Sequence, residues 1–100
     1  MIQLKPIDIE GRTVLGVEVK LPKTTLLVIT TDKGYIMCGA LDVALLNERL
    51  SDRNIIAARA LGVRSLEQLL EAPLESVTHT AESMGITAGM TGREALLKMM

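Results

Sequence analysis

The chain has 100 residues, 48% of them hydrophobic and 23% charged, and its net charge at pH 7 is −1. This length predicts a single domain, residues 1–100. The near-neutral charge and the absence of Phe and Trp argue against nucleic-acid or membrane partners, because a basic surface and base-stacking platforms are both missing. The sequence contains no apolar stretch of about 20 residues, so no membrane span is predicted. No signal peptide is visible. The single cysteine excludes an internal disulfide and favours a reducing, cytoplasmic location.

The first forty residues predict an antiparallel meander of four strands. Apolar residues between Ile2 and Ile7 indicate a first strand, which Pro6 confines to the edge of the sheet. Residues 15–21 alternate between apolar and polar, as a half-buried strand does. Residues 26–29 and 35–38 are apolar throughout, which predicts a sheet covered on both faces. The turn between them ends at Gly34, for which a left-handed backbone is expected.

The second half of the sequence is predicted to be mostly helical. Asp42 is a plausible N-cap for a helix that continues to about Leu50. Residues 54–61 are short and apolar and end at Gly62, which indicates a strand. Ser65 and Gln68 form a capping-box pattern that opens a further helix.

Two more helices are predicted near the end of the chain. Pro73 suits the first turn of a helix whose apolar residues recur every three or four positions as far as Met84. Thr91 and Glu94 form a second capping-box pattern, which starts the last helix. The predicted fold class is therefore α+β: an N-terminal four-stranded, mostly antiparallel meander, then a helix, a short strand and three C-terminal helices packed on the sheet.

Three segments carry a resemblance to a known family: GYIMCGALDVALLNERL, GVRSLEQLL and GITAGMTGREALLKM. They resemble the YunC-like family of small bacterial and archaeal proteins, which is described as a domain of unknown function. The similarity covers nearly the whole chain and is specific in GITAGMTGREAL. It implies a compact domain of α and β elements, but it supplies no activity and no catalytic residue.

The first candidate site lies where the fourth strand passes into a helix, at Cys38, Gly39 and Asp42. A thiol near a helix N-terminus can be a nucleophile, and Gly39 would let a substrate approach the backbone. The alternative is an inert, packed cysteine, which apolar neighbours favour. His79 is the only histidine, and its spacing places it off the apolar stripe, in solvent, so a Cys38–His79 pair is disfavoured. One Cys and one His give no zinc-type spacing, so neither a metal nor a cofactor is expected.

The second candidate site is the loop from Gly85 to Arg93, in which Gly89 and Gly92 flank Thr91 before the last helix. Free amides at a helix start bind anions, and an arginine in the first turn suits phosphate or carboxylate. The alternative is a capped turn without a ligand, because Glu94 would occupy the cap and repel an anion.

Three functions therefore remain open. The first is an oligomeric structural or regulatory module, since two strands that are apolar on both faces predict a homo-oligomer. The second is a binder of a small anion or metabolite at the Gly85–Arg93 loop. The third is a thiol enzyme that uses Cys38. Paired carboxylates, a triad and a metal set are all lacking, which argues against catalysis.

Overall fold

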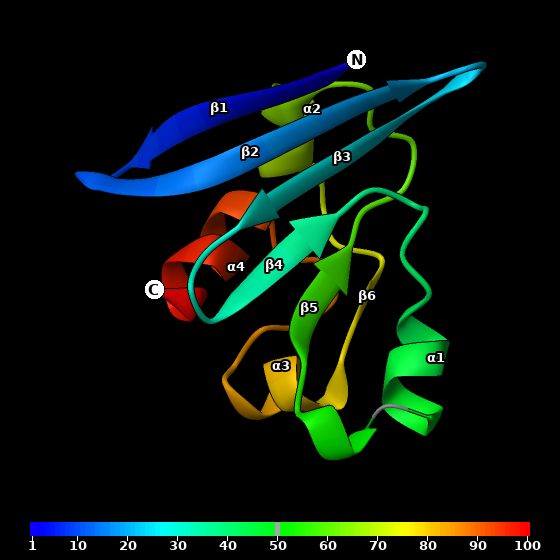
Figure 1. Cartoon of the computed structure of the whole chain (residues 1–100). Helices are drawn as coiled ribbons and strands as arrows, with labels where there is room; N and C mark the ends of the chain where they lie inside the picture. The colour runs from blue at the N-terminus through cyan, green and yellow to red at the C-terminus, as the bar shows by residue number, and fades with distance from the viewer. Residues whose placement is uncertain (50) are drawn as a thin grey trace.

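The computed structural model describes residues 1–49 and 51–100, in which six strands form one mixed sheet (Figure 1). The strands lie side by side in chain order, and only β4 and β5 run parallel. The α+β class is confirmed, and the sheet has one strand more than the sequence predicts. The strands are β1 (Ile2–Ile9), β2 (Arg12–Leu21), β3 (Thr24–Thr30), β4 (Gly34–Met37), β5 (Ile56–Arg59) and β6 (Ser76–Val77).

Four α-helices and one 3₁₀ turn complete the described chain: α1 (Val43–Glu48), the 3₁₀ turn Ser51–Arg53, α2 (Leu66–Glu71), α3 (His79–Ser83) and α4 (Gly92–Met99). The predicted N-caps Asp42, Ser65 and Thr91 are confirmed, because each side chain accepts an amide hydrogen bond from the first turn of its helix. The predicted end of the first helix, Leu50, lies outside the described residues. No helix in the described part of the chain is long and apolar enough to cross a membrane.

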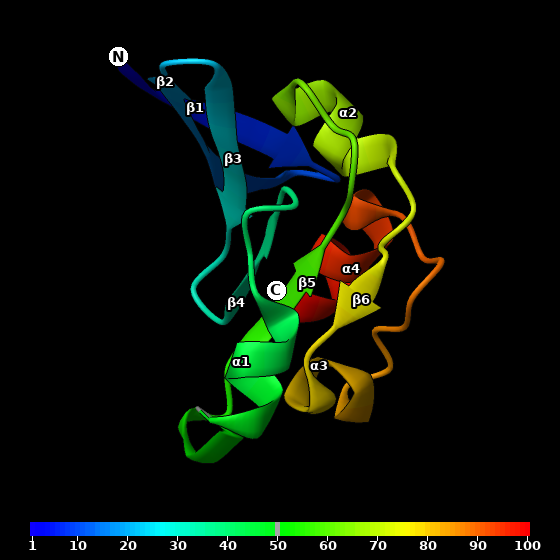
Figure 2. The ribbon, with the colours of Figure 1, turned by 90° about the vertical axis from the view of Figure 1, so that its right-hand side faces the viewer.

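Helices α2 and α4 cover one face of the sheet (Figure 2). Leu27 and Ile29 of β3 and Ile36 of β4 are fully buried on this face. Leu69 of α2 and Leu96 of α4 are fully buried in the same cluster. Each such aliphatic side chain contributes about 1.5–3 kcal/mol through removal from water, so this interface holds the meander and the C-terminal helices together.

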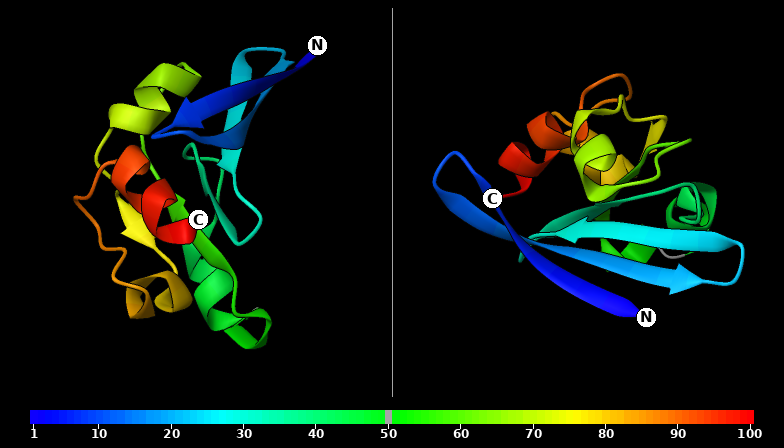
Figure 3. Two further views of the ribbon diagram at one scale, coloured as in Figure 1. Left: turned by 90° about the vertical axis from the view of Figure 1, so that its left-hand side faces the viewer. Right: turned by 90° about the horizontal axis from the view of Figure 1, so that it is seen from above.

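The opposite face of β1 to β4 is called here the outer face. A side chain added at Gly16 would meet Leu66 of α2, so Gly16 and its register partners point toward the helices. Alternate residues therefore point the other way, and Figure 3 shows no helix stacked on that side of β1 to β3. The outer face comprises Ile2, Leu4, Pro6, Asp8, Thr13, Leu15, Val17, Val19, Leu21, Thr24, Leu26, Val28, Thr30, Tyr35 and Met37, of which Asp8 is the charged residue.

The predicted helix from Pro73 to Met84 is wrong. Its first part is β6, whose Ser76 pairs with Arg59 of β5, and only the second part forms α3. The helix begins at Thr78 because the Thr78 hydroxyl accepts the Ala81 amide and donates to Ile55 O at 2.7 Å. An N-cap fixed in this way to the residue before β5 prevents the helix from starting earlier.

Gly34 is also not the left-handed turn residue that the sequence predicts. Its φ angle is not positive, and it instead opens β4, opposite Ile56. A Cβ at this position would lie 2.5 Å from the Ile56 carbonyl oxygen. Close contact between the parallel strands, rather than turn geometry, therefore requires glycine here.

Candidate functional site

Cys38 follows β4 directly and extends its pairing with β3, because its amide donates to Leu27 O at 3.1 Å. The residue is 7% exposed and belongs to the main hydrophobic cluster. Its carbonyl oxygen accepts the amide of Leu41, which closes a tight turn before α1. These contacts match the packed alternative for Cys38, and the reactive alternative stays a prediction.

The other residues of this segment have local structural contacts. A Cβ on Gly39 would lie 3.1 Å from Cδ2 of Leu61, so the glycine leaves space for that side chain. Asp42 Oδ1 accepts the Leu45 amide at 3.0 Å as the N-cap of α1. The carboxylate of Asp42 is thus engaged with the helix that follows it.

His79 is not hydrogen-bonded to Cys38. It is exposed, as its spacing predicts, at the first position of α3, and its amide donates to Asn47 Oδ1 at 2.8 Å. Within the described chain, no hydrogen bond joins the Cys38 thiol to a base. The arrangement supplies no positioned partner that would activate the thiol.

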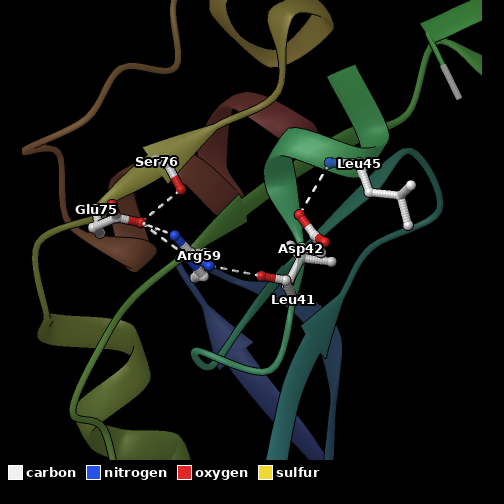
Figure 4. Close-up of polar contacts among 6 residues, drawn as sticks. All are labelled: Leu41, Asp42, Leu45, Arg59, Glu75 and Ser76. Atoms are coloured by element: carbon white, nitrogen blue, oxygen red, sulfur yellow. Dashed lines mark hydrogen bonds and ion pairs between the residues drawn. The ribbon is translucent and has the colours of Figure 1, made fainter. Parts of the chain in front are cut away.

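A polar cluster that the sequence did not predict lies next to this segment (Figure 4). Arg59 of β5 donates through Nε and Nη2 to Glu75 Oε1, at 2.9 and 2.6 Å, and through Nη1 to Leu41 O at 3.0 Å. Ser76 Oγ also donates to Glu75 Oε1, at 2.7 Å. One arginine therefore connects the turn after Cys38 to the chain beside β6.

The donors around Glu75 change its acidity. The hydrogen bond from Ser76, and then the hydrogen bond and the charge of Arg59, hold the pKa of Glu75 below its ordinary value of 4.5. Because the Arg59 guanidinium already faces a carboxylate and a carbonyl, it is engaged in structure rather than free for a ligand.

The sequence did contain a signal for this cluster. Arg59 is the only charged side chain within the apolar run of residues 55–61. A charge in a short apolar strand requires a partner. The partner itself, Glu75, is sixteen residues away and could not be identified from local patterns.

Glycines shape the loop before α4. Gly85 has φ 86° and follows the C-cap of α3, while Gly89 has φ 92° and donates its amide to Leu74 O. Gly92 is buried, and its amide donates to Ala72 O at 3.3 Å. The backbone of this loop is thus tied to the segment between α2 and β6.

The start of α4 is closed by its own side chains. The Glu94 amide donates to Thr91 Oγ1, and Glu94 Oε1 accepts the Thr91 amide, both at 3.2 Å, which confirms the predicted capping box. Arg93 pairs with Glu71 of α2, with Nη2 at 2.8 Å from Oε1. These contacts match the alternative of a capped turn, and an anion at this loop stays a prediction.

The candidate residues therefore form two separate groups in the sequence and in their contacts. Cys38, Gly39 and Asp42 lie in the segment that Arg59 holds, whereas Gly89, Thr91, Gly92 and Arg93 lie in the loop before α4. No group of three His, Cys, Asp or Glu side chains in the described part of the chain is placed to hold a metal ion.

Comparison with known proteins gives concordant matches. The family model of DUF1805, a domain of unknown function, matches residues 37–99. The uncharacterized protein YunC of Bacillus subtilis strain 168 is 64% identical over 100 residues, which is 100% of this chain and 99% of the relative. The crystal structure of TA1206, a protein of unknown function from Thermoplasma acidophilum, superposes with a TM-score of 0.89 at 31% identity and covers 100% of this chain and 94% of that one. The chain therefore belongs to the YunC-like family of proteins that carry the DUF1805 domain.

Proposed function

We propose that the protein works as a homo-oligomeric structural or regulatory module, in which the outer faces of two copies pack together. The observation that carries this proposal is the apolar, uncovered surface of β1 to β3. Ile2 and Leu4 are 67% and 63% exposed, although both belong to regular strands. The unpaired Cys38 supports a cytoplasmic setting for this assembly.

The outer face is organised in cross-strand rows. Leu4, Val17, Val28 and Met37 lie opposite one another on four successive strands. Neighbouring rows run from Ile2 to Leu26 and from Pro6 to Tyr35, and they carry no charged residue. A contiguous apolar surface of this kind on a folded protein normally marks an interface.

The outer face is large enough to bind a second copy of the protein. Strands about 4.8 Å apart with a rise of about 3.3 Å per residue give β1 to β4 a footprint of roughly 500 Å². Projecting side chains raise the accessible area further, toward the roughly 800 Å² that each partner buries in a standard interface. Two such faces can stack about 10 Å apart as in a β-sandwich.

The edges of the sheet fit a partner less well than its face. β1 is the edge strand of the meander, and its Pro6 has no amide to donate. β6 at the other edge has two residues. Pairing through strand edges would also leave the outer face in water, so face-to-face packing is favoured.

Analytical ultracentrifugation at micromolar concentration tests the proposal. The wild type should sediment as a dimer or a larger closed assembly. Leu4→Glu should raise the dissociation constant at least about tenfold, because a buried unpaired carboxylate is costly. Lys5→Glu is the control, since it adds a carboxylate at the next residue on the opposite side of the same strand. It lowers the net charge by two, against one for Leu4→Glu, and should still leave the assembly intact.

A monomeric wild type, or equal weakening by both substitutions, would contradict the proposal. Circular dichroism of each variant separates loss of assembly from loss of folding. Val17→Glu, in the neighbouring strand and the same row, repeats the test if Leu4→Glu fails to fold.

A further inference from the structure

Three segments that are distant in sequence meet at one end of the sheet: the start of β2, the turn between β3 and β4, and the end of α4 (Figures 1 and 3). They enclose a cleft of about 520 Å³. Volumes of about 300–1,000 Å³ are typical of small-molecule sites. The cleft lies apart from the Cys38 segment and from the loop before α4.

The wall of the cleft is fixed by Thr31. Its Oγ1 accepts the amides of Lys33 and Gly34, each at 3.1 Å, and lies 3.3 Å from Met99 O. These contacts set the shape of the β3–β4 turn and join the turn to the end of α4. The geometry is therefore present before any ligand binds, which lowers the entropic cost of binding.

The lining of the cleft is largely aliphatic. Val14 and Met99 are buried at its base, and Pro6 and Leu15 contribute exposed apolar surface. No aromatic side chain lines it. Such a lining suits an aliphatic chain rather than a ring that would stack on an aromatic surface.

Two positively charged side chains lie at the rim of the cleft. Arg12 and Lys33 line the cleft and are exposed, and neither forms an ion pair within the described part of the chain. Asp32 and the α-carboxylate of Met100, the last residue of the sequence, are the negative groups of the lining. Two cations that form no ion pair, next to an aliphatic cleft floor, are complementary to a small anion that carries a hydrocarbon chain.

We propose that this cleft binds a small amphipathic anion, with its aliphatic chain against Pro6 and Leu15, above the buried Val14 and Met99, and its carboxylate or phosphate between Arg12 and Lys33. This site goes beyond the proposed assembly. It shares Pro6, Thr13, Leu15 and Thr30 with the outer face, whereas Arg12, Lys33 and Met99 lie outside that face. The carboxylate and phosphate ligands that fit this site share one anionic group on a short saturated hydrocarbon chain.

Octanoate titrated into the ¹⁵N-labelled protein, followed by amide chemical shifts, tests the proposal. Binding should be saturable and should shift the amides of Val14, Thr31 and Met99. Acetate, which has the charge without the chain, and octanol, which has the chain without the charge, should each bind at least about tenfold more weakly. Octyl phosphate in parallel decides between carboxylate and phosphate as the preferred head group.

The double variant Arg12→Ala/Lys33→Ala should weaken octanoate binding at least about tenfold. Arg49→Ala/Arg64→Ala removes the same charge from exposed positions outside the cleft and should bind as the wild type does. Arg12→Gln/Lys33→Gln replaces the first double variant if that variant does not give a folded spectrum.

Three results would overturn the site: equal affinity of the two double variants, acetate binding as tight as octanoate binding, or shifts confined to other regions. Leu4→Glu keeps this test separate from the proposed assembly. It should not weaken octanoate binding even if it abolishes oligomers.

Discussion

Gly92, at the start of α4, lies in close contact with Leu69 of α2 and Ile36 of β4. A Cβ at this position would overlap the Leu69 carbonyl oxygen and would lie 2.7 Å from Cδ1 of Ile36. The φ angle is not positive, so the requirement comes from contact and not from backbone conformation. Within the loop before α4, this glycine therefore has a packing role of its own.

Gly92→Ala should destabilise the protein by about 1–3 kcal/mol, the usual cost of overpacking a well-filled interior. Urea unfolding followed by circular dichroism measures the difference. Gly39→Ala is the control, because its added methyl meets only the flexible end of the exposed Leu61. Similar losses in both variants would show that the contact with Leu69 is not the cause.

The thiol of Cys38 should resist a polar alkylating reagent in the native protein and react fully in denaturant, because the side chain is buried in the main cluster. Iodoacetamide labelling followed by mass spectrometry measures both rates. Rapid labelling of the native protein would contradict this expectation and would favour the thiol enzyme over the packed cysteine.

Threonine hydroxyls set the starts of two helices at the level of secondary-structure elements. Thr91 caps α4 within its own loop, whereas Thr78 caps α3 and also accepts the Ala57 amide of β5 at 3.2 Å. The first cap follows from adjacent residues, and the second depends on a strand twenty-one residues earlier. Helix boundaries in this chain thus have both local and tertiary causes.

Thr91→Ala should cost about 1 kcal/mol, since it removes the acceptor for the Glu94 amide. The free energy of unfolding in urea gives the value. Thr87→Ala serves as the control, because Thr87 lies in the same loop and is exposed. An equal loss at Thr87 would mean that loop composition, rather than capping, determines the effect.

The Arg59–Glu75 pair should make the stability of the β5–β6 region depend on pH. Since the folded-state pKa of Glu75 is lowered, its contribution is present above the ordinary value of 4.5 and is lost as pH falls through the folded-state pKa. Glu75→Gln should therefore be less stable than the wild type at pH 7, and the difference should shrink under acid conditions. Urea unfolding from pH 7 to pH 3 measures it.

Glu10→Gln, at an exposed turn, is the control for the Glu75→Gln measurements. Its free energy of unfolding should differ less from that of the wild type at every pH. A Glu75→Gln difference that stays constant down to pH 3 would show that the charge of Glu75 does not stabilise the fold.

Local patterns predicted those parts of the fold that depend on neighbouring residues. Alternation and turn residues indicated the meander, and the caps at Asp42 and Thr91 were evident from side-chain type. The strand β6 was missed because its pairing with β5 is long-range, while Leu74, Val77 and Ala81 also fit a helical period. All three side chains are buried, although Leu74 precedes β6, Val77 lies in β6 and Ala81 lies in α3, so this arrangement satisfies the same spacing.

The candidate site was predictable only in part for a similar reason. Sequence reasoning identified the segment at Cys38 but not Arg59 and Glu75, whose contact requires β5 and β6 to be adjacent. It anticipated excess apolar surface, yet alternation alone does not say which side of the sheet the helices cover. The position of α2 in the structure is what identifies the surface of β1 and β2 that no helix covers.

On the scale of the whole molecule, the part that the family model matches depends on the part outside it. Residues 37–99 begin at the end of β4, so β1 to β3 lie outside that match. Leu27 and Ile29 of β3 nevertheless form the surface on which the matched helices pack. The meander thus completes the core on one side and presents the proposed assembly surface on the other.

The absence of Trp and Phe makes Tyr35 an optical reporter at the proposed interface. Tyr35 is the single tyrosine, is half-buried, and lies on the outer face between Thr30 and Ala57. Its ultraviolet emission can therefore be assigned without a label. Acrylamide should quench this emission more strongly in Leu4→Glu than in the wild type, and wild-type quenching should fall as protein concentration rises. Quenching that is identical in both proteins at all concentrations would place Tyr35 outside any buried contact between copies.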